Sequence, residues 1–408
     1  MSDMAKKLKE YCTVISGYAF KSKDLSEGTD IPEGTDIPVI KIGNISNGGN
    51  IVIDNSTQYV KKEFLAIDEK YHIKNGDILI SLTGSHMNQP NSMVGRCCRN
   101  LDNTVYLLNQ RAGKIIPKKT IVRDFLYYVF RLQSIQYAIA NRAYGGANQV
   151  NVSPKDVMGI KFNIPDIAVQ KKIAKVFVAY DSLIENNKKR IRLLEQMAEN
   201  LYKEWFVRFR FPGYEDVEFE NGFPKDWKIE RLSDIADIIM GQSPESENYN
   251  NNCEGLPFHQ GVGSYGDFYL IDDIYSTKGN RIAEANSIIF SVRAPVGRIN
   301  ITLNKIILGS GVASINSVKG YNAYLLWMLK NQFQQVDIIG NGSIFTSVTK
   351  KELFGFKILM PHEDLIQKFD SIASGIEGEM RKLSLINDNL AKQRDMLLPR
   401  LMNGKLEV

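Results

Sequence analysis

Two long stretches of this chain repeat apolar residues in alternating steps of four and three. These steps keep one apolar stripe on one face of a helix, which is the pattern of a coiled-coil seam. In the first stretch, residues 165–211, the seam positions are Ile173, Phe177, Tyr180, Ile184, Asn187, Ile191, Leu194, Ala198, Leu201 and Trp205. In the second, residues 361–408, they are Phe369, Ala373, Ile376, Met380, Leu383, Asn387, Leu390, Arg394, Leu397 and Leu401.

The two seams have the same phase, because Pro165 and Pro361 precede them at the same distance, 196 positions apart. A single seam also fits the core of an ordinary helix bundle. Two seams in one phase, each closing a mixed globular segment, instead indicate that a whole unit is repeated.

The polar seam residues predict a register for the two helices. A compact domain between them favours an antiparallel pair, in which Asn187 and Asn387 face each other and their amides hydrogen-bond. That choice places Ile173 opposite Leu401 and Trp205 opposite Phe369. The alternative is that both asparagines lie at the edges of the seam, in water.

Composition places few limits on the partner. The chain has 408 residues, enough for two or three domains, and a net charge of +5, which permits a polyanion. Residues 188–210 concentrate basic side chains, which also fits a solvated helix face. The four cysteines show no paired CxxC spacing, so we expect reduced thiols and no zinc site. No apolar run approaches the length of a membrane span, so we expect a soluble, cytoplasmic protein without a membrane partner.

Residues 1–164 have the pattern of a mixed domain with short strands and turns. We predict strands at 38–42 and 76–81, a turn at 47–50 and a core helix at 124–140. A polar loop at 145–149 then precedes a short helix that begins at Ser153.

Residues 212–360 repeat this order after a linker that contains an acidic stretch. Leu8 matches Leu232 at an offset of 224 positions, Ser81 matches Ser291 at 210, and Gly95 matches Gly297 at 202. Falling offsets mean that a shared framework carries loops of different length. Two such domains are suited to recognise two different ligands or binding sites.

No motif in the sequence predicts a catalytic site. The segment 261–266 fits GxGxxG, but a strand is expected at 267–271 where a dinucleotide loop would open a helix. Neither a phosphate loop, an HExxH motif nor an Asn-Pro-Pro-Tyr-like segment is present, and the four histidines are scattered. Spacing alone does not reveal a triad whose members meet only in the fold.

The sequence resembles the specificity subunit of type I restriction-modification systems over nearly its whole length. The resemblance rests on motifs that follow one another in the family's order. These are Ile164-Pro165 with Gln170, Ile173 and Asp181; Trp205 to Gly213; Trp227 with Leu232 to Ile235; Met360-Pro361 with Gln367; and Leu398 to Leu401.

The resemblance implies an α+β fold with two mixed α/β target-recognition domains in tandem, each followed by a long helix. The domains would span 1–164 and, with the linker, 212–360, and the helices 165–211 and 361–408 would pair as an antiparallel coiled coil with pseudo-two-fold symmetry. Each domain would read one half of a bipartite double-stranded DNA target. The helices would set the spacing and dock two methyltransferase subunits.

The same resemblance implies that the chain is not itself an enzyme and holds no cofactor. S-adenosylmethionine would belong to the methyltransferase subunits, and ATP and Mg²⁺ to the motor-nuclease subunits of the full complex.

Arginine, asparagine and glutamine on loops are the side chains best suited to bidentate contacts with base edges. We therefore predict DNA-binding residues in the polar loops of both domains, although each single residue also fits an ordinary surface role. They are Asn88, Gln89, Arg96, Arg99, Arg142, Asn148 and Gln149 in the first domain, and His259, Gln260, Arg293, Arg298, Asn341, Ser343 and Thr346 in the second.

Two other functions remain open from the sequence. One is a DNA methyltransferase or nuclease that acts alone, against which the missing motifs count. The other is a coiled-coil scaffold that binds only protein, which gives no reason for two diverged polar-loop domains.

Overall fold

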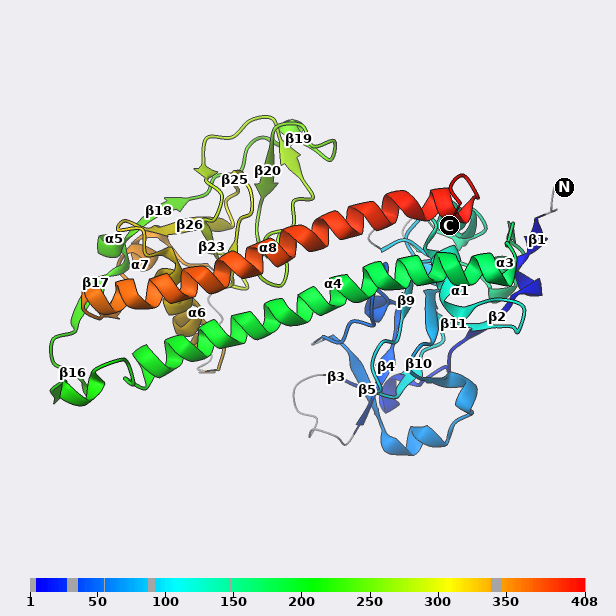
Figure 1. Cartoon of the computed structure of the whole chain (residues 1–408), viewed down its shortest axis with the longest axis horizontal. Helices are drawn as coiled ribbons and strands as arrows, with labels where there is room; N and C mark the ends of the chain where they lie inside the picture. The colour runs from blue at the N-terminus through cyan, green and yellow to red at the C-terminus, as the bar shows by residue number, and fades with distance from the viewer. Residues whose placement is uncertain are drawn as a thin grey trace. The chain divides into compact units, whose positions relative to one another are not determined.

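The computed structural model describes residues 5–27, 36–54, 56–86, 92–146, 149–338 and 347–407, without the side chains of 334–338. The chain forms two compact units, Met1–Glu185 with Asn387–Val408, and Asn186–Ile386. We call them unit 1 and unit 2. Each unit combines one globular part with a portion of both long helices, α4 (Ile167–Tyr202) and α8 (Glu363–Met402) (Figure 1).

Unit 1 contains two main sheets. The first has the order β2-β11-β7-β9 and is antiparallel throughout, with the strands Cys12–Ser16, Ala112–Pro117, Ile78–Ser81 and Cys97–Arg99. The second has the order β3-β5-β4-β10-β6, with the strands Ser26–Glu27, Gln58–Lys61, Asp36–Ile40, Tyr106–Leu108 and His72–Ile73. The two predicted strands appear here as β4 and β7. Strand β1 (Lys6–Lys7) pairs with β14 (Lys161–Phe162).

The prediction of a single core helix at 124–140 was wrong, because the structure has two helices in this range. They are α1 (Arg123–Arg131) and α2 (Gln133–Ala140), separated by Leu132 with φ −62° and ψ 127°. Leu132 is itself buried, and both helices bury apolar residues in the same core. The apolar periodicity therefore continues across the break, which is why the pattern did not reveal it.

The short helix predicted from Ser153 is confirmed as α3 (Pro154–Met158). The Ser153 hydroxyl accepts a hydrogen bond from the Asp156 backbone N–H at 3.2 Å, and Pro154 occupies the first helical turn. At this position the serine cap followed by proline therefore marks the start of the helix.

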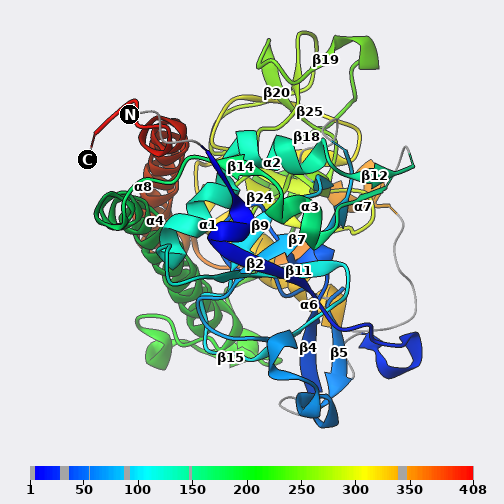
Figure 2. The ribbon, with the colours of Figure 1, turned by 90° about the vertical axis from the view of Figure 1, so that its right-hand side faces the viewer.

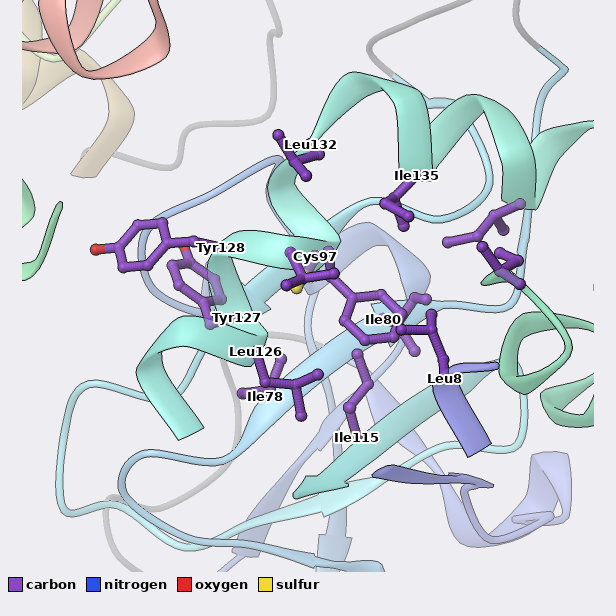
Figure 3. Close-up of a cluster of buried hydrophobic side chains, with 14 of the residues drawn as sticks. Leu8, Ile78, Ile80, Cys97, Ile115, Leu126, Tyr127, Tyr128, Leu132 and Ile135 are labelled. Atoms are coloured by element: carbon purple, nitrogen blue, oxygen red, sulfur yellow. The ribbon is translucent and has the colours of Figure 1, made fainter. Parts of the chain in front are cut away.

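The core of unit 1 packs one face of α1 against the first sheet (Figure 3). Ile78, Ile80 and Ile115 from the sheet meet Leu126 from α1, and all four are at most 1% exposed. Further core residues come from the long helices: Ile173, Phe177, Leu398, Leu401 and Met402. The globular part of unit 1 therefore shares one hydrophobic core with the ends of both long helices.

Unit 2 repeats the two main sheets of unit 1 strand by strand, which confirms the predicted duplication. Its first sheet has the order β18-β26-β23-β24, with the strands Ala236–Met240, Val312–Ser317, Ile288–Ser291 and Ile299–Ile301. Its second has the order β19-β21-β20-β25-β22, with Tyr249–Asn250, Tyr275–Ser276, Leu256–His259, Ile306–Leu308 and Ile282–Ala283. Unit 2 also contains β15 (Phe219–Glu220), paired with β16 (Phe223–Pro224), and β17 (Lys228–Arg231), paired with β27 (Lys357–Met360). Its shorter helices include α5 (Leu232–Ile235), α6 (Asn322–Ile338) and α7 (Lys350–Phe354).

The two long helices lie antiparallel within each unit, as predicted (Figure 2). In unit 1, the Arg394 guanidinium of α8 contacts the Asp181 carboxylate of α4 at 2.8 Å. In unit 2, the rings of Trp205 and Phe369, predicted to face each other, have centroids 5.8 Å apart. The register is therefore supported at this layer.

The predicted pairing of Asn187 with Asn387 stays a prediction, because the two residues belong to different units. Their exposed fractions are 9% and 8%. The Asn387 side-chain amide donates a hydrogen bond to the Ile184 carbonyl at 3.3 Å. These low exposures argue against the alternative in which both side chains lie in water.

The first long helix ends earlier than the predicted boundary at 211. After Tyr202 the chain makes a π-helical turn at Lys203–Val207, and Phe209 has a left-handed backbone with φ +57°. The Phe209 and Phe211 rings pack against Trp227, with centroids 5.4 and 5.8 Å away. This aromatic cluster redirects the chain toward the linker.

A polar residue of each long helix caps the main helix of its globular part. In unit 1, the Gln170 side chain accepts a hydrogen bond from the Val122 N–H at 2.8 Å, at the start of α1. In unit 2, the Asp370 carboxylate accepts from the Tyr324 N–H at 3.0 Å, near the start of α6. Gln367, which follows Pro361 as Gln170 follows Pro165, is exposed, and Asp370 makes this contact in its place.

Candidate nucleic-acid interface

In unit 1, the structure brings together the two polar loops predicted to contact DNA. Strand β8 (Thr83–Gly84) opens the first loop and pairs with β13 (Val150–Asn151), which closes the second. Strand β13 also pairs with β12 (Tyr144–Gly145), and the Thr83 hydroxyl donates to the Asn151 side chain at 2.7 Å. The bases of the two loops therefore form one short sheet.

Unit 2 joins its two corresponding loops in the same way. Arg293 forms an antiparallel bridge with Ser347, and the Val348 N–H donates to the Val292 carbonyl at 2.8 Å. Both globular parts thus have an edge at which the bases of two loops pair, and we call it the loop edge. In unit 1 it consists of Thr83–Gly84, Tyr144–Gly145 and Val150–Asn151, and in unit 2 of residues 292–293 and 347–348.

The predicted DNA-binding residues fall into three groups. Those outside the described residues are Asn88, Gln89, Asn148, Asn341, Ser343 and Thr346. Those that are exposed are Arg142, Gln149, Gln260, Arg293 and Arg298. Arg96 is half-buried, while Arg99 and His259 are buried. DNA contact stays a prediction for every one of them.

Arg99 is held inside unit 1 by a network of its own. Its guanidinium pairs with Asp124 at 3.1 Å and Asp181 at 3.2 Å, and it stacks on the Tyr127 ring at 4.1 Å. The Arg99 side chain is 9% exposed. These contacts give Arg99 a structural role that sequence reasoning missed, since only the fold brings its partners together.

His259 also lies within a polar network. Its Nδ1 lies 2.7 Å from the Ser264 hydroxyl and its Nε2 lies 2.9 Å from Asp272, whose second oxygen accepts from the Asn304 amide at 2.7 Å. His259 is 1% exposed, and these bonds fasten the glycine-rich turn to the sheet. The spacing of these residues in the sequence gave no sign of the network.

The glycine-rich segment 261–266 is a turn, as predicted, with a 3-10 helix at Val262–Ser264. The prediction of a strand at 267–271 was wrong. Only isolated bridges occur there, Tyr265 with Leu270 and Tyr269 with Ile301. Phe268, Tyr269 and Leu270 are buried, so their apolar run reflects packing rather than a regular strand.

Each globular part docks on its following long helix through an aromatic donor and a partly buried acid. In unit 1, the Tyr128 hydroxyl of α1 donates to Asp181 of α4 at 2.6 Å. In unit 2, the Trp327 Nε1–H of α6 donates to Glu377 of α8 at 3.0 Å. Asp181 and Glu377 are 196 positions apart, so the contact is duplicated with the rest of the fold.

The electrostatic surroundings of the two acids differ. Asp181 contacts two guanidinium groups, those of Arg99 and Arg394. Near Glu377, the Lys330 ammonium instead pairs with Glu195 at 2.6 Å. Burial raises the pKa of Glu377 to about 7, with a smaller contribution from the charge of Asp370, whereas the Trp327 hydrogen bond and the Lys330 charge lower it.

We expect the stability of unit 2 to fall as the pH rises from about 4.5 to about 7, because folded Glu377 holds a proton that the unfolded chain has lost. The full penalty is present above pH 7 and amounts to roughly 3 kcal/mol. The variant Glu377→Gln stays neutral and still accepts from Trp327, so it should lose this pH dependence. Urea unfolding at pH 5 and pH 8, followed by tryptophan fluorescence, measures the effect. Equal pH slopes in variant and wild type would contradict it.

The described residues contain no cluster of histidine, cysteine or acidic side chains that could hold a metal ion. Burial raises the pKa of the Cys12 and Cys98 thiols to about 12 and also raises that of Cys97. These three thiols are therefore protonated and inert at neutral pH.

Comparison with known proteins identifies the family. The sequence profile of the Methylase_S family, described as "Type I restriction modification DNA specificity domain", matches residues 1–196 and 224–374. The chain belongs to this family. The two matched segments correspond to the duplicated halves seen in the structure, and the predicted type I specificity subunit is confirmed.

Relatives named as specificity subunits cover most of the chain. The "Putative type I restriction enzyme MjaX specificity subunit" of Methanocaldococcus jannaschii is 29% identical over 86% of this chain and 82% of its own length. The "Type I restriction enzyme HindI specificity subunit" of Haemophilus influenzae is 23% identical over 88% of this chain and 94% of its own.

The fold also matches a solved member of the family. The crystal structure of the type I restriction-modification S subunit from M. genitalium superposes with a TM-score of 0.55 at 14% identity, over 98% of this chain and 97% of that one. This likeness confirms the α+β fold with two tandem domains.

Membership implies DNA and the methyltransferase and nuclease subunits of such systems as partners, and catalysis in those partners. In the part of the chain that the structure describes, none of the helices combines the length and apolarity needed to span a bilayer.

Proposed function

We propose that this chain is the DNA-recognition subunit of a type I restriction-modification complex, in which each unit reads one half of a bipartite target. The duplicated loop edge carries this proposal. Both units have the same sheet orders, yet the loops between shared positions differ in length. One framework with two different loop sets is what the recognition of two unlike half-sites requires.

We further propose that the outer faces of α4 and α8 dock two methyltransferase subunits. Both helices expose large apolar side chains away from their shared seam. They include Leu183 (52% exposed), Leu193 (64%), Met197 (56%), Ile372 (44%), Leu385 (44%), Ile386 (47%) and Met396 (62%). Exposed large apolar side chains on a helix face are candidates for a protein interface.

The 40-residue α8 is about 60 Å long, and this rigid length is suited to set the spacing between half-sites. In this scheme S-adenosylmethionine is bound by the methyltransferase subunits, and ATP and Mg²⁺ by the motor-nuclease subunits. The chain itself supplies recognition and assembly, in the cytoplasm where the DNA lies.

Methylome sequencing of a host that carries this chain with its methyltransferase partner tests the proposal. We expect adenine methylation at one bipartite motif with a fixed spacer. Hosts with the partner alone and with the chain alone are the controls, and both should lack the motif. Methylation by the chain alone would indicate a stand-alone enzyme. An unchanged methylome with a stable complex would indicate a scaffold.

A further inference from the structure

The loop edge of unit 2 contains a short loop whose ends are fixed by a fully buried serine. Ser291, at the end of β23, is 0% exposed. Its hydroxyl donates to the Pro295 carbonyl at 2.7 Å and accepts from the Arg298 N–H at 2.8 Å. Its carbonyl accepts from the Gly297 N–H at 3.0 Å. One side chain thus joins the start of the loop to its end.

The same loop is fixed from two further sides. The Val292 N–H donates to the Gly311 carbonyl at 2.9 Å, beside β26, and the Val292 carbonyl accepts from Val348 at 2.8 Å. Five residues, 292–296, lie between Ser291 and Gly297, and Arg293 is the charged one among them. The backbone that carries Arg293 is therefore held by bonds on both sides and across to the second loop.

Unit 1 contains the same arrangement around Ser81, also 0% exposed. The Ser81 hydroxyl accepts from the Arg96 N–H at 3.0 Å and its carbonyl accepts from Gly95 at 2.9 Å. Leu82 bonds to Arg111 and Val152 as Val292 bonds to Gly311 and Val348. Thirteen residues, 82–94, separate Ser81 from Gly95, against five in unit 2. The serine clamp is thus a repeated framework feature that accepts loops of different length.

Arg293 differs from Arg96 and Arg142 in that its guanidinium is available to bind a ligand. Its side chain is exposed and, within the described part of the chain, makes no hydrogen bond or ion pair. By contrast, Arg96 donates to the Ile42 carbonyl at 3.1 Å and Arg142 to the Ala138 carbonyl at 3.1 Å. Because the backbone that carries Arg293 is already fixed, the loop loses less conformational entropy when its guanidinium binds a ligand.

We propose that Arg293 recognises a guanine in the half-site read by unit 2, and that Ser291 is the positioning residue for the loop that carries it. The guanidinium fork of an arginine matches the two acceptors, O6 and N7, that guanine presents in the major groove. Nearby Lys350, exposed at the start of α7, has the point charge suited to a phosphate instead. This inference rests on the proposed function.

The test is the methylome of a host that carries the full chain with its methyltransferase partner. The half-site of unit 2 is assigned first by domain exchange. Arg293→Ala and Arg293→Lys should each relax one G·C position of that half-site, with about ten- to hundredfold less discrimination there. All other positions should stay unchanged. Lys350→Ala is the matched control and should lower methylation at every site without changing the motif.

Two results would overturn the role of Arg293. One is a wild-type half-site of unit 2 without any G·C pair. The other is an unchanged motif in both Arg293 variants, which indicates a phosphate contact or none. In either case the bipartite wild-type motif still supports the proposed function, whereas a wild type without such a motif removes both.

Ser291→Ala tests positioning, and Ser81→Ala is its counterpart in unit 1. Ser291→Ala should relax the same single position as the Arg293 variants, to a smaller degree, while Ser81→Ala leaves it intact. Loss of methylation at all sites without relaxation, in a variant with wild-type circular dichroism, shows that Ser291 is only structural. If Ser291→Ala does not fold, Ser291→Cys keeps a small side chain there and should give the same relaxation.

Discussion

Replacing Asp181 with alanine is expected to lower the free energy of unfolding of unit 1 by about 3–5 kcal/mol. The Asp181 carboxylate accepts from Tyr128 and pairs with Arg99 and Arg394, whose side chains are 9% and 13% exposed. The substitution removes the acceptor of the Tyr128 hydroxyl and one acceptor of each guanidinium, and the acids that remain, Asp124 for Arg99 and Asp395 for Arg394, are more exposed than Asp181. Removing one member of a buried network costs more than the network itself contributes.

The three tryptophans, Trp205, Trp227 and Trp327, all lie in unit 2, so their fluorescence does not report on unit 1. Hydrogen exchange measured by mass spectrometry resolves the two units, with peptides from β7 and β11 reporting on unit 1 and tryptophan fluorescence on unit 2. A matched control is Glu379→Ala, whose ion pair with Arg190 is about half exposed on each side. The control should cost less than about 1 kcal/mol. Equal losses in the two variants would show that burial of the Asp181 network adds nothing.

Exchanging residues 8–164 for the corresponding domain of a relative is expected to replace one half-site of the target completely. The other half-site should stay unchanged, because the loop edge of unit 2 is built only from unit 2 residues. The exchanged domain must still fit the long helices. A donor with arginine and tyrosine at the positions of Arg99 and Tyr128 satisfies Asp181.

Methylome sequencing of the exchanged protein with its partner measures this result, and the reciprocal exchange in unit 2 is the control. A donor domain that lacks the arginine at position 99 should give the same new half-site with a less stable protein. If both half-sites change after one exchange, then the two units do not read independently.

Features set by short-range pattern were predictable from the sequence. The alternating steps of four and three predicted the two long helices. An apolar stripe determines which helix face is buried, and this does not depend on which residues pack against that face. The serine before Pro154 predicted the start of α3. The falling offsets between the two halves predicted that their loops differ in length. The contact between Trp205 and Phe369 followed from a single assumption about register.

Features set by distant partners were not predictable. Leu132 breaks a helix within an unbroken apolar pattern, and Asp370 rather than Gln367 makes the contact with the start of α6 that Gln170 makes with α1. Arg99 looked like a loop arginine for DNA, but the fold surrounds it with Asp124, Asp181 and Tyr127. A residue's type shows what it can bind, whereas the fold decides what it meets.

Unit 1 is assembled from two distant parts of the chain, and this has a consequence during synthesis. Leu398, Leu401 and Met402 belong to its core, and Arg394 neutralises its buried Asp181, yet a ribosome makes them only after the whole of unit 2. Until the end of the chain has been made, the first domain therefore exposes part of its apolar core, and the Asp181 carboxylate lacks its Arg394 partner. Unit 2, continuous in the chain, has all its parts first. The half that is translated first should thus be the half that matures last, and chaperones have the longest access to it.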